Sequence, residues 1–247
     1  MNPFFHAVAF LTRLPVPRLS DSKEDWVRSV PYYPLVGLLI GALLWLAAIS
    51  FSFLLTPPVA AVLTLAVWIF VTGGLHLDGW MDLADGLGSH RPREDMLRIM
   101  KDSRVGAMGV IAAILLILLK AVLLYEIIQK GLSFHLVLVP VLARLMLVFA
   151  IWHWPYVSVQ GIGTGMREGL TRWKIGIGFI FVASLALLLE GVPGLLSLVV
   201  VLLMGWMFTV GVCKKLGGLT GDAYGALVEW TEAVGLLLLF LFWRWLG

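Results

Sequence analysis

Seven long apolar runs, separated by short polar, glycine-rich or proline-rich segments, make up most of this chain. They cover approximately residues 31–55, 57–75, 106–128, 132–152, 173–190, 192–213 and 223–246. A helix needs about 20 mostly apolar residues to cross the hydrocarbon core of a bilayer. Apolar residues make up 60% of the 247 residues and charged residues 13%, against about 45–50% and about 25% in soluble domains. We therefore expect an all-α, polytopic membrane helix bundle in which residues 1–247 form a single domain.

Some segments are expected to lie at the membrane surface or to enter it without crossing. Residues 3–18 are predicted to form an interfacial helix that ends at the prolines of the sequence LTRLPVP. Glycines allow close backbone approach, or break a helix into a re-entrant piece, and five of them lie at the end of the second apolar run or after it: Gly73, Gly74, Gly79, Gly86 and Gly88. The only cysteine, Cys213, rules out an intramolecular disulfide and a zinc site built from cysteines.

Basic residues are distributed unevenly between the two predicted sides of the membrane. With the N-terminus in the cytoplasm, fourteen of the eighteen lysines and arginines lie in cytoplasmic loops, and the opposite loops hold only Lys130. Basic loops stay on the cytoplasmic side, so we expect a multi-pass protein of the cytoplasmic membrane whose polar loops face the cytoplasm. The net charge of +3 arises from these loops, which favours contact with anionic lipid over nucleic acid.

The most charged segment, residues 73–109, contains six of the fifteen acidic residues. Asp78, Asp82 and Asp85 project within about 60° of one another on a helix that turns about 100° per residue. Carboxylates this close repel each other unless a cation lies between them, and oxygen ligands suit Mg²⁺ or Mn²⁺. We therefore expect these three aspartates to hold a metal ion, with a solvated polar loop as the alternative.

A second group of candidates surrounds the start of the third apolar run. Arg104, together with a helix N-terminus, is suited to hold a phosphate, and Asp102 would add a metal ligand or orient that arginine. The alternative is that Arg104 reaches lipid phosphate. Lys101 is a further candidate for substrate binding. His76 is either a general base or ligand, or a hydrogen-bonded residue at a helix end.

The sequence GGLTGDAYGALVEWTE carries another acidic group into the last apolar run. Asp222, Glu229 and Glu232 fall on one side of a helix, and acids entering hydrocarbon need a metal, a substrate hydroxyl or basic partners such as Lys214 and Lys215. An amphipathic helix at the membrane surface is the alternative. A glycine-rich loop, QGIGTGMREGLTRWK, adds Arg167 as a candidate for contacting an anionic substrate or lipid.

Four stretches, LTRLPVP, GGLHLDGWMDLADG, KDSRVGAMG and GGLTGDAYGALVE, are spread over essentially the whole chain. Together they resemble the cobalamin (5′-phosphate) synthase family, also called the adenosylcobinamide-GDP ribazoletransferases. The resemblance implies a Mg²⁺-dependent enzyme of the bacterial inner membrane. In the implied reaction, a hydroxyl of α-ribazole or its 5′-phosphate attacks the cobinamide-linked phosphate of adenosylcobinamide-GDP, and GMP leaves.

This resemblance, added to the residue patterns, leads to a set of expected roles. The metal ligands are Asp78, Asp82, Asp85 and Asp102. The catalytic residues are Asp82, Asp222, Glu229 and His76, with Asp222 or Glu229 as the base or as a ligand of a second metal. The substrate-binding residues are Arg104, Lys101, Arg167 and Glu232. The expected partners are the two substrates and membrane lipids, and association into a homo-oligomer is left open.

Two other classes of membrane protein would have similar acidic residues in their sequences. A CDP-alcohol phosphotransferase-like lipid enzyme also uses intramembrane aspartates, and Asp78-Gly79 followed by Asp82 resembles the start of its motif. However, Asp82-Leu83 stands where that motif has an alanine-arginine pair. A cation-coupled transporter would also have buried acids, but transporters place them at mid-membrane within paired repeats, and this sequence has no evident repeat.

Overall fold

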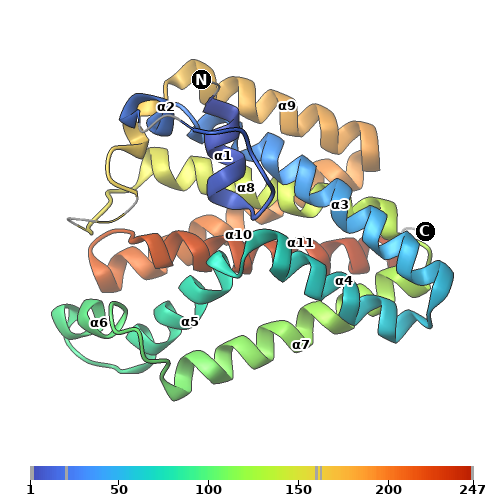
Figure 1. The fold of residues 1–247 in the computed structure, drawn as a ribbon, viewed down its shortest axis with the longest axis horizontal. Coiled ribbons are helices and arrows are strands. Elements are labelled where there is room, and N and C mark those ends of the chain that lie inside the picture. The colour runs from blue at the N-terminus through green and yellow to red at the C-terminus, as the bar shows by residue number, and fades with distance from the viewer. Residues whose placement is uncertain (1–2, 20–21, 159–160, 162, 246–247) are drawn as a thin grey trace.

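The structure, a computed structural model, describes residues 3–19, 22–158, 161 and 163–245 (Figure 1). The described residues form eleven α-helices and three short 3₁₀ helices. The α-helices are α1 (Pro3–Leu11), α2 (Lys23–Val27), α3 (Tyr33–Leu54), α4 (Pro57–Thr72), α5 (Leu75–Gly88), α6 (Arg93–Ile99), α7 (Ala107–Gln129), α8 (Leu138–His153), α9 (Arg172–Glu190), α10 (Val192–Leu216) and α11 (Gly221–Trp245). The 3₁₀ helices are η1 (Val30–Tyr32), η2 (Ser133–Val137) and η3 (Met166–Gly169).

The predicted helical membrane architecture is confirmed. Six helical segments of the described chain are long and apolar enough to cross a membrane, and the bent pair of α4 and α5 would provide a seventh. Each expected apolar run corresponds to one helix, from α3 to α11, with ends that differ by a few residues. The first helix differs more: α1 ends at Leu11, well before residue 18. The backbone N–H of Arg13 donates to the carbonyl of Val71 in α4, at 2.7 Å, and not to a carbonyl of α1, and Pro15 disfavours helical geometry at the residue before it.

A pair of glycines produces the bend between α4 and α5. Gly73 and Gly74 both adopt left-handed backbone angles, with φ of 65° and 68°, which glycine adopts readily. The two helices consequently meet at 89°. A Cβ atom at Gly73 would also lie 2.2 Å from Nε of Arg13, so the N-terminal segment packs directly against the bend. This break is the re-entrant or broken segment that the glycine pattern predicts.

The helices form a bundle around α8 and α11. Helix α8 is the most deeply buried of the candidate spans, whereas α9 lies at the edge and is the least buried. Helix α11 packs against α5, α7, α8 and α10. In Figure 1 the short helices α5 and α6 lie at the left end of the bundle, with the loop that follows α8, whereas the α3–α4 turn lies at the right end. The irregular polar segments therefore share one end of the molecule.

Candidate active site

A cavity of about 380 Å³ lies where these polar segments meet. Its walls come from α5 and α6, from α8, from the beginning of α11, from the segments that follow α6 and α8, including η3, and from α1 and the beginning of α3. Of the residues predicted to be functional, four line it: His76, Asp78, Lys101 and Asp222. The cavity therefore joins the first acidic cluster of the sequence to part of the second.

Close packing of α5 against α11 brings these residues together. A Cβ atom at Gly79 would lie 2.7 Å from the carbonyl oxygen of Asp222, and one at Gly225 would lie 3.2 Å from the Cα of His76. Only glycine allows two helix backbones to approach this closely. We expected Gly79 to allow close approach of a ligand or to break the helix; it lies against the neighbouring helix instead, as does Gly225.

The carboxylates of Asp78, Asp82 and Asp222 form the acidic side of the site. Asp82 lies within electrostatic range of both other aspartates, and Asp222 also lies within range of Lys101. The Thr220 hydroxyl donates a 3.4 Å hydrogen bond to Asp222. Among the described residues, neither Asp78 nor Asp82 has a hydrogen-bond or ion-pair partner. Adjacent carboxylates without partners favour binding of a cation.

The structure gives Asp85 a different role from that of its neighbours. Its two carboxylate oxygens accept hydrogen bonds from the backbone N–H groups of Gly106 and Gly109, at 2.7 and 2.8 Å. These groups lie at the start of α7, where a negative charge is stabilised by the helix dipole. Asp85 therefore anchors α7 to α5, and its oxygens are already occupied by backbone donors.

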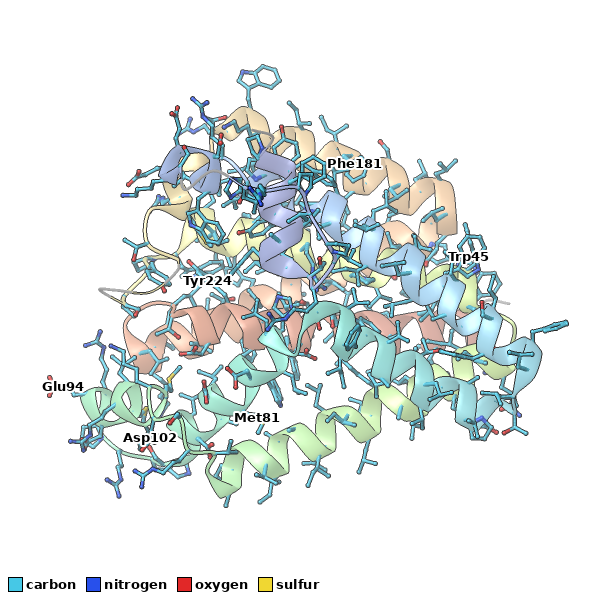
Figure 2. All side chains as sticks on the ribbon, viewed as in Figure 1. Trp45, Met81, Glu94, Asp102, Phe181 and Tyr224 are labelled. Atoms are coloured by element: carbon cyan, nitrogen blue, oxygen red, sulfur yellow. The ribbon has the colours of Figure 1, made fainter. Side chains whose placement is uncertain are left out.

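Asp102 and Arg104 form an exposed ion pair of 2.7 Å, and neither lines the cavity. Hydrogen bonds from Arg104 lower the pKa of the Asp102 carboxyl to about 2. Figure 2 shows Asp102 at the edge of the molecule and Tyr224 in its interior. Arg167 is exposed in η3, next to Met166, which does line the cavity. The expected orienting contact of Asp102 with Arg104 is present, but it lies outside the cavity.

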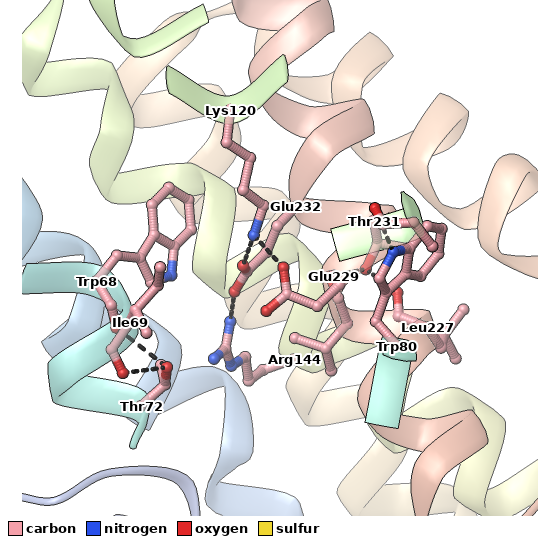
Figure 3. A network of polar contacts seen from close by, with 12 residues as sticks. Trp68, Ile69, Thr72, Trp80, Lys120, Arg144, Leu227, Glu229, Thr231 and Glu232 are labelled. Carbon is pink, nitrogen blue, oxygen red and sulfur yellow. Dashed lines mark hydrogen bonds and ion pairs between the residues drawn. The ribbon is translucent and has the colours of Figure 1, made fainter. Parts of the chain in front are cut away.

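Glu229 and Glu232 belong to a separate, buried network of charges (Figure 3). Lys120 of α7 pairs with both glutamates, at 2.7 Å from Glu232, and Arg144 of α8 also pairs with Glu232. All four side chains are buried. Neither glutamate lines the large cavity.

The expected basic partners of these glutamates were therefore wrong: Lys120 and Arg144, from two other helices, replace Lys214 and Lys215. Two spans supply the positive charges because a charge inside a helix bundle requires a nearby counter-charge. The sequence did indicate buried ion pairs, because Lys120 and Arg144 each interrupt an apolar run. Sequence reasoning also missed two aromatic residues of the cavity wall, Tyr156 and Tyr224.

The carboxylates of Asp78, Asp82 and Asp222 have the chemistry of a Mg²⁺ site, and of the three, Asp78 and Asp222 line the cavity. Among the described residues, no group of three or more His, Cys, Asp or Glu side chains is arranged to hold a metal ion by itself. Mg²⁺, however, is usually bound by one or two carboxylates together with water and substrate phosphates. Asp78, Asp82 and Asp222 provide such oxygen ligands, and no basic side chain among the described residues forms an ion pair with them.

The fold and the site together define a multi-pass helical membrane protein with an acidic cavity at one end of its bundle. The family model described as cobalamin-5-phosphate synthase matches residues 3–240. A relative from Brevibacillus brevis, named adenosylcobinamide-GDP ribazoletransferase, is 51% identical, with 100% of each chain covered. Relatives of the same name from Desulfitobacterium hafniense and Pseudomonas putida are each 41% identical; the comparison covers 96% of both chains in the first case, and 98% and 99% in the second. No solved structure matches.

The chain therefore belongs to the cobalamin-5-phosphate synthase family, and it is a transferase. This confirms the resemblance found in the sequence, and it favours neither a CDP-alcohol phosphotransferase-like enzyme nor a transporter.

Proposed function

We propose that this enzyme joins adenosylcobinamide-GDP to α-ribazole, or to α-ribazole 5′-phosphate, and releases GMP. The names of the relatives support this choice of substrates. The structural observation that carries the proposal is the group formed by Asp78, Asp82 and Asp222 beside the cavity, where carboxylates meet without an ion-pair partner among the described residues. Phosphoryl transfer from a pyrophosphate donor requires cations at the phosphates and a carboxylate near the attacking hydroxyl.

Each residue of the site has a proposed task. Asp78 and Asp82 would hold Mg²⁺, which when bound supplies positive charge to the pyrophosphate. Asp222 accepts the proton of the attacking ribose hydroxyl as a general base. The hydroxyl oxygen forms a bond to the cobinamide-linked phosphorus, and the bond from that phosphorus to the oxygen of GMP breaks. Lys101, at the cavity wall, binds a phosphate oxygen.

The site is proposed to face the cytoplasm of a bacterial cell. The polar segments that build the cavity are also the loops that carry most of the basic residues of the chain, and such loops remain on the cytoplasmic side of the membrane. In this orientation the cavity opens to the compartment that contains nucleotides and Mg²⁺.

The direct test uses purified protein in lipid nanodiscs with adenosylcobinamide-GDP, α-ribazole and Mg²⁺. We expect a cobalamin product and GMP in equal amounts, and no GMP when α-ribazole is omitted. Asp82→Asn should be nearly inactive at limiting Mg²⁺, because an amide keeps the shape of the side chain but lacks the charge. Asp95→Asn, at a partly exposed aspartate paired with Arg98 in α6, is the matched control and should remain active. Wild-type turnover by Asp82→Asn at limiting Mg²⁺ would contradict the metal assignment.

A further inference from the structure

Aromatic side chains from four separate parts of the chain line the cavity, in addition to its carboxylates. They are Phe10 of α1, Tyr33 of α3, Tyr156 after α8 and Tyr224 of α11. The rings of Tyr156 and Tyr224 stack with centroids 5.7 Å apart and planes 15° apart. The rings of Phe10 and Tyr33 lie 6.0 Å apart. The cavity therefore combines an acidic group with aromatic walls.

Of this stacked pair, Tyr156 is the more exposed ring. Tyr224 is only 7% exposed, whereas Tyr156 is half-buried. The hydroxyl of Tyr156 accepts a 3.3 Å hydrogen bond from the backbone N–H of Gly163, and Gly161 is packed so closely that a Cβ atom there would meet the same hydroxyl. Tyr224 supports one face of the Tyr156 ring and the glycine loop fixes its hydroxyl, so the ring has a defined orientation.

The size and the lining of the cavity limit which part of the substrates it can enclose. A volume of about 380 Å³ is near the lower end of the roughly 300–1,000 Å³ range of small-molecule pockets. It suits a nucleoside and is too small for a corrin ring with its substituents. Its other walls are largely apolar, with Leu97, Leu147 and Ile151 among them. Guanine has N–H and carbonyl groups that are costly to bury without hydrogen bonds, whereas the benzimidazole of α-ribazole has an apolar ring edge.

We propose that this cavity is the binding site of the acceptor nucleoside, and that the base of the nucleoside stacks on Tyr156. This inference rests on the proposed function. The flat base packs on the Tyr156 ring and the apolar wall, and the ribose lies toward Asp222 and Asp78. Tyr224 and Asp222 are two residues apart at the start of α11, so one short segment supports both the base and the ribose hydroxyl. The corrin and guanosine parts of the donor then remain outside the cavity.

The test compares Tyr156→Leu, Tyr156→Phe and Tyr125→Leu with the wild type in nanodiscs. Tyr125, half-buried in α7 and not part of the cavity wall, is the matched control. If the base stacks on Tyr156, Tyr156→Leu should raise both the KM for α-ribazole and its calorimetric Kd by about tenfold or more. The KM for adenosylcobinamide-GDP should stay unchanged. Tyr125→Leu should resemble the wild type. Tyr156→Phe keeps the ring but loses the hydrogen bond from Gly163, so it should weaken α-ribazole binding less than Tyr156→Leu does.

Two results would overturn the inference. A rise in the KM of the donor, with that of α-ribazole unchanged, would place a part of adenosylcobinamide-GDP in the cavity. Unchanged affinity of Tyr156→Leu for α-ribazole would remove Tyr156 from the site. Calorimetry separates this inference from the proposed function: wild-type protein that binds α-ribazole but forms no product contradicts only the function. Wild-type protein that forms product while Tyr156→Leu binds α-ribazole normally contradicts only the inference.

Discussion

Replacing Lys120 by methionine should destabilise the protein strongly, because Lys120 links the buried charges of α7 and α11. Its ammonium group pairs with Glu229 and Glu232 and lies 4.7 Å from the centre of the Trp68 ring. Without it, Glu232 keeps Arg144, but Glu229 loses the only ion-pair partner that it has among the described residues. Removing one partner of a buried pair typically costs about 3–5 kcal/mol. We expect a loss in this range for Lys120→Met.

A second substitution should restore much of this loss. In Lys120→Met/Glu229→Gln the remaining pair of Arg144 and Glu232 is electrically neutral, and a buried amide without a partner costs only about 1–3 kcal/mol. The assay is thermal and denaturant-induced unfolding in detergent, analysed as a double-mutant cycle. Lys130→Met is the matched control. Lys130, which follows the last residue of α7, forms a partly exposed 3.9 Å pair with Glu126 and lies 4.8 Å from the centre of the Phe240 ring, so its loss should cost about 1–2 kcal/mol.

The reasoning would be refuted if Lys120→Met unfolded under the same conditions as Lys130→Met. It would also be refuted if the effects of the two substitutions in the double variant simply added, because additivity would show that Lys120 and Glu229 do not interact.

Two further predictions concern packing and orientation. Gly79→Ala should cost about 1–3 kcal/mol because its Cβ atom would meet the backbone of α11 at 2.7 Å. Gly211→Ala, which meets no atom within 4 Å, should be neutral or stabilising; equal unfolding temperatures for the two variants would contradict the close approach of α5 and α11. The orientation is tested in intact cells, with a protein whose Cys213 has been replaced. The thiol of Arg91→Cys, on the cytoplasmic side, should not react with an impermeant thiol reagent, whereas the thiol of Lys130→Cys, on the opposite side, should react. The reverse labelling pattern would contradict the proposed orientation.

The membrane helices were predictable from the sequence because their signal is local. An apolar run of about 20 residues fixes a span wherever its neighbours lie. The break after α4 was similarly visible in Gly73-Gly74, although its 89° angle depends on packing. The common face of Asp78 and Asp82 followed from helical periodicity alone.

Contacts between distant segments were not predictable in this way. Lys120 and Glu229 are separated by 109 residues, and no periodicity within either helix indicates that they meet. Asp85 shares the helical face of Asp78 and Asp82. However, the start of α7 packs against it, so backbone N–H groups donate hydrogen bonds to its carboxylate. Glu229 and Asp222 likewise share a face of α11. Only the packing of α5, α7 and α8 around that helix places Asp222 at the cavity and Glu229 in a buried ion pair.

The convergence of the two acidic clusters at one cavity is tested most directly by the single-turnover rate of Asp222→Asn. The measurement uses excess enzyme with labelled adenosylcobinamide-GDP, saturating α-ribazole and saturating Mg²⁺, together with the Kd of the donor. Because a general base contributes about 10²–10⁴-fold to rate, Asp222→Asn should slow the transfer by at least about a hundredfold while donor affinity changes little. Asp95→Asn should match the wild type. A transfer rate for Asp222→Asn close to that of the wild type would show that Asp222 takes no part in the chemical step.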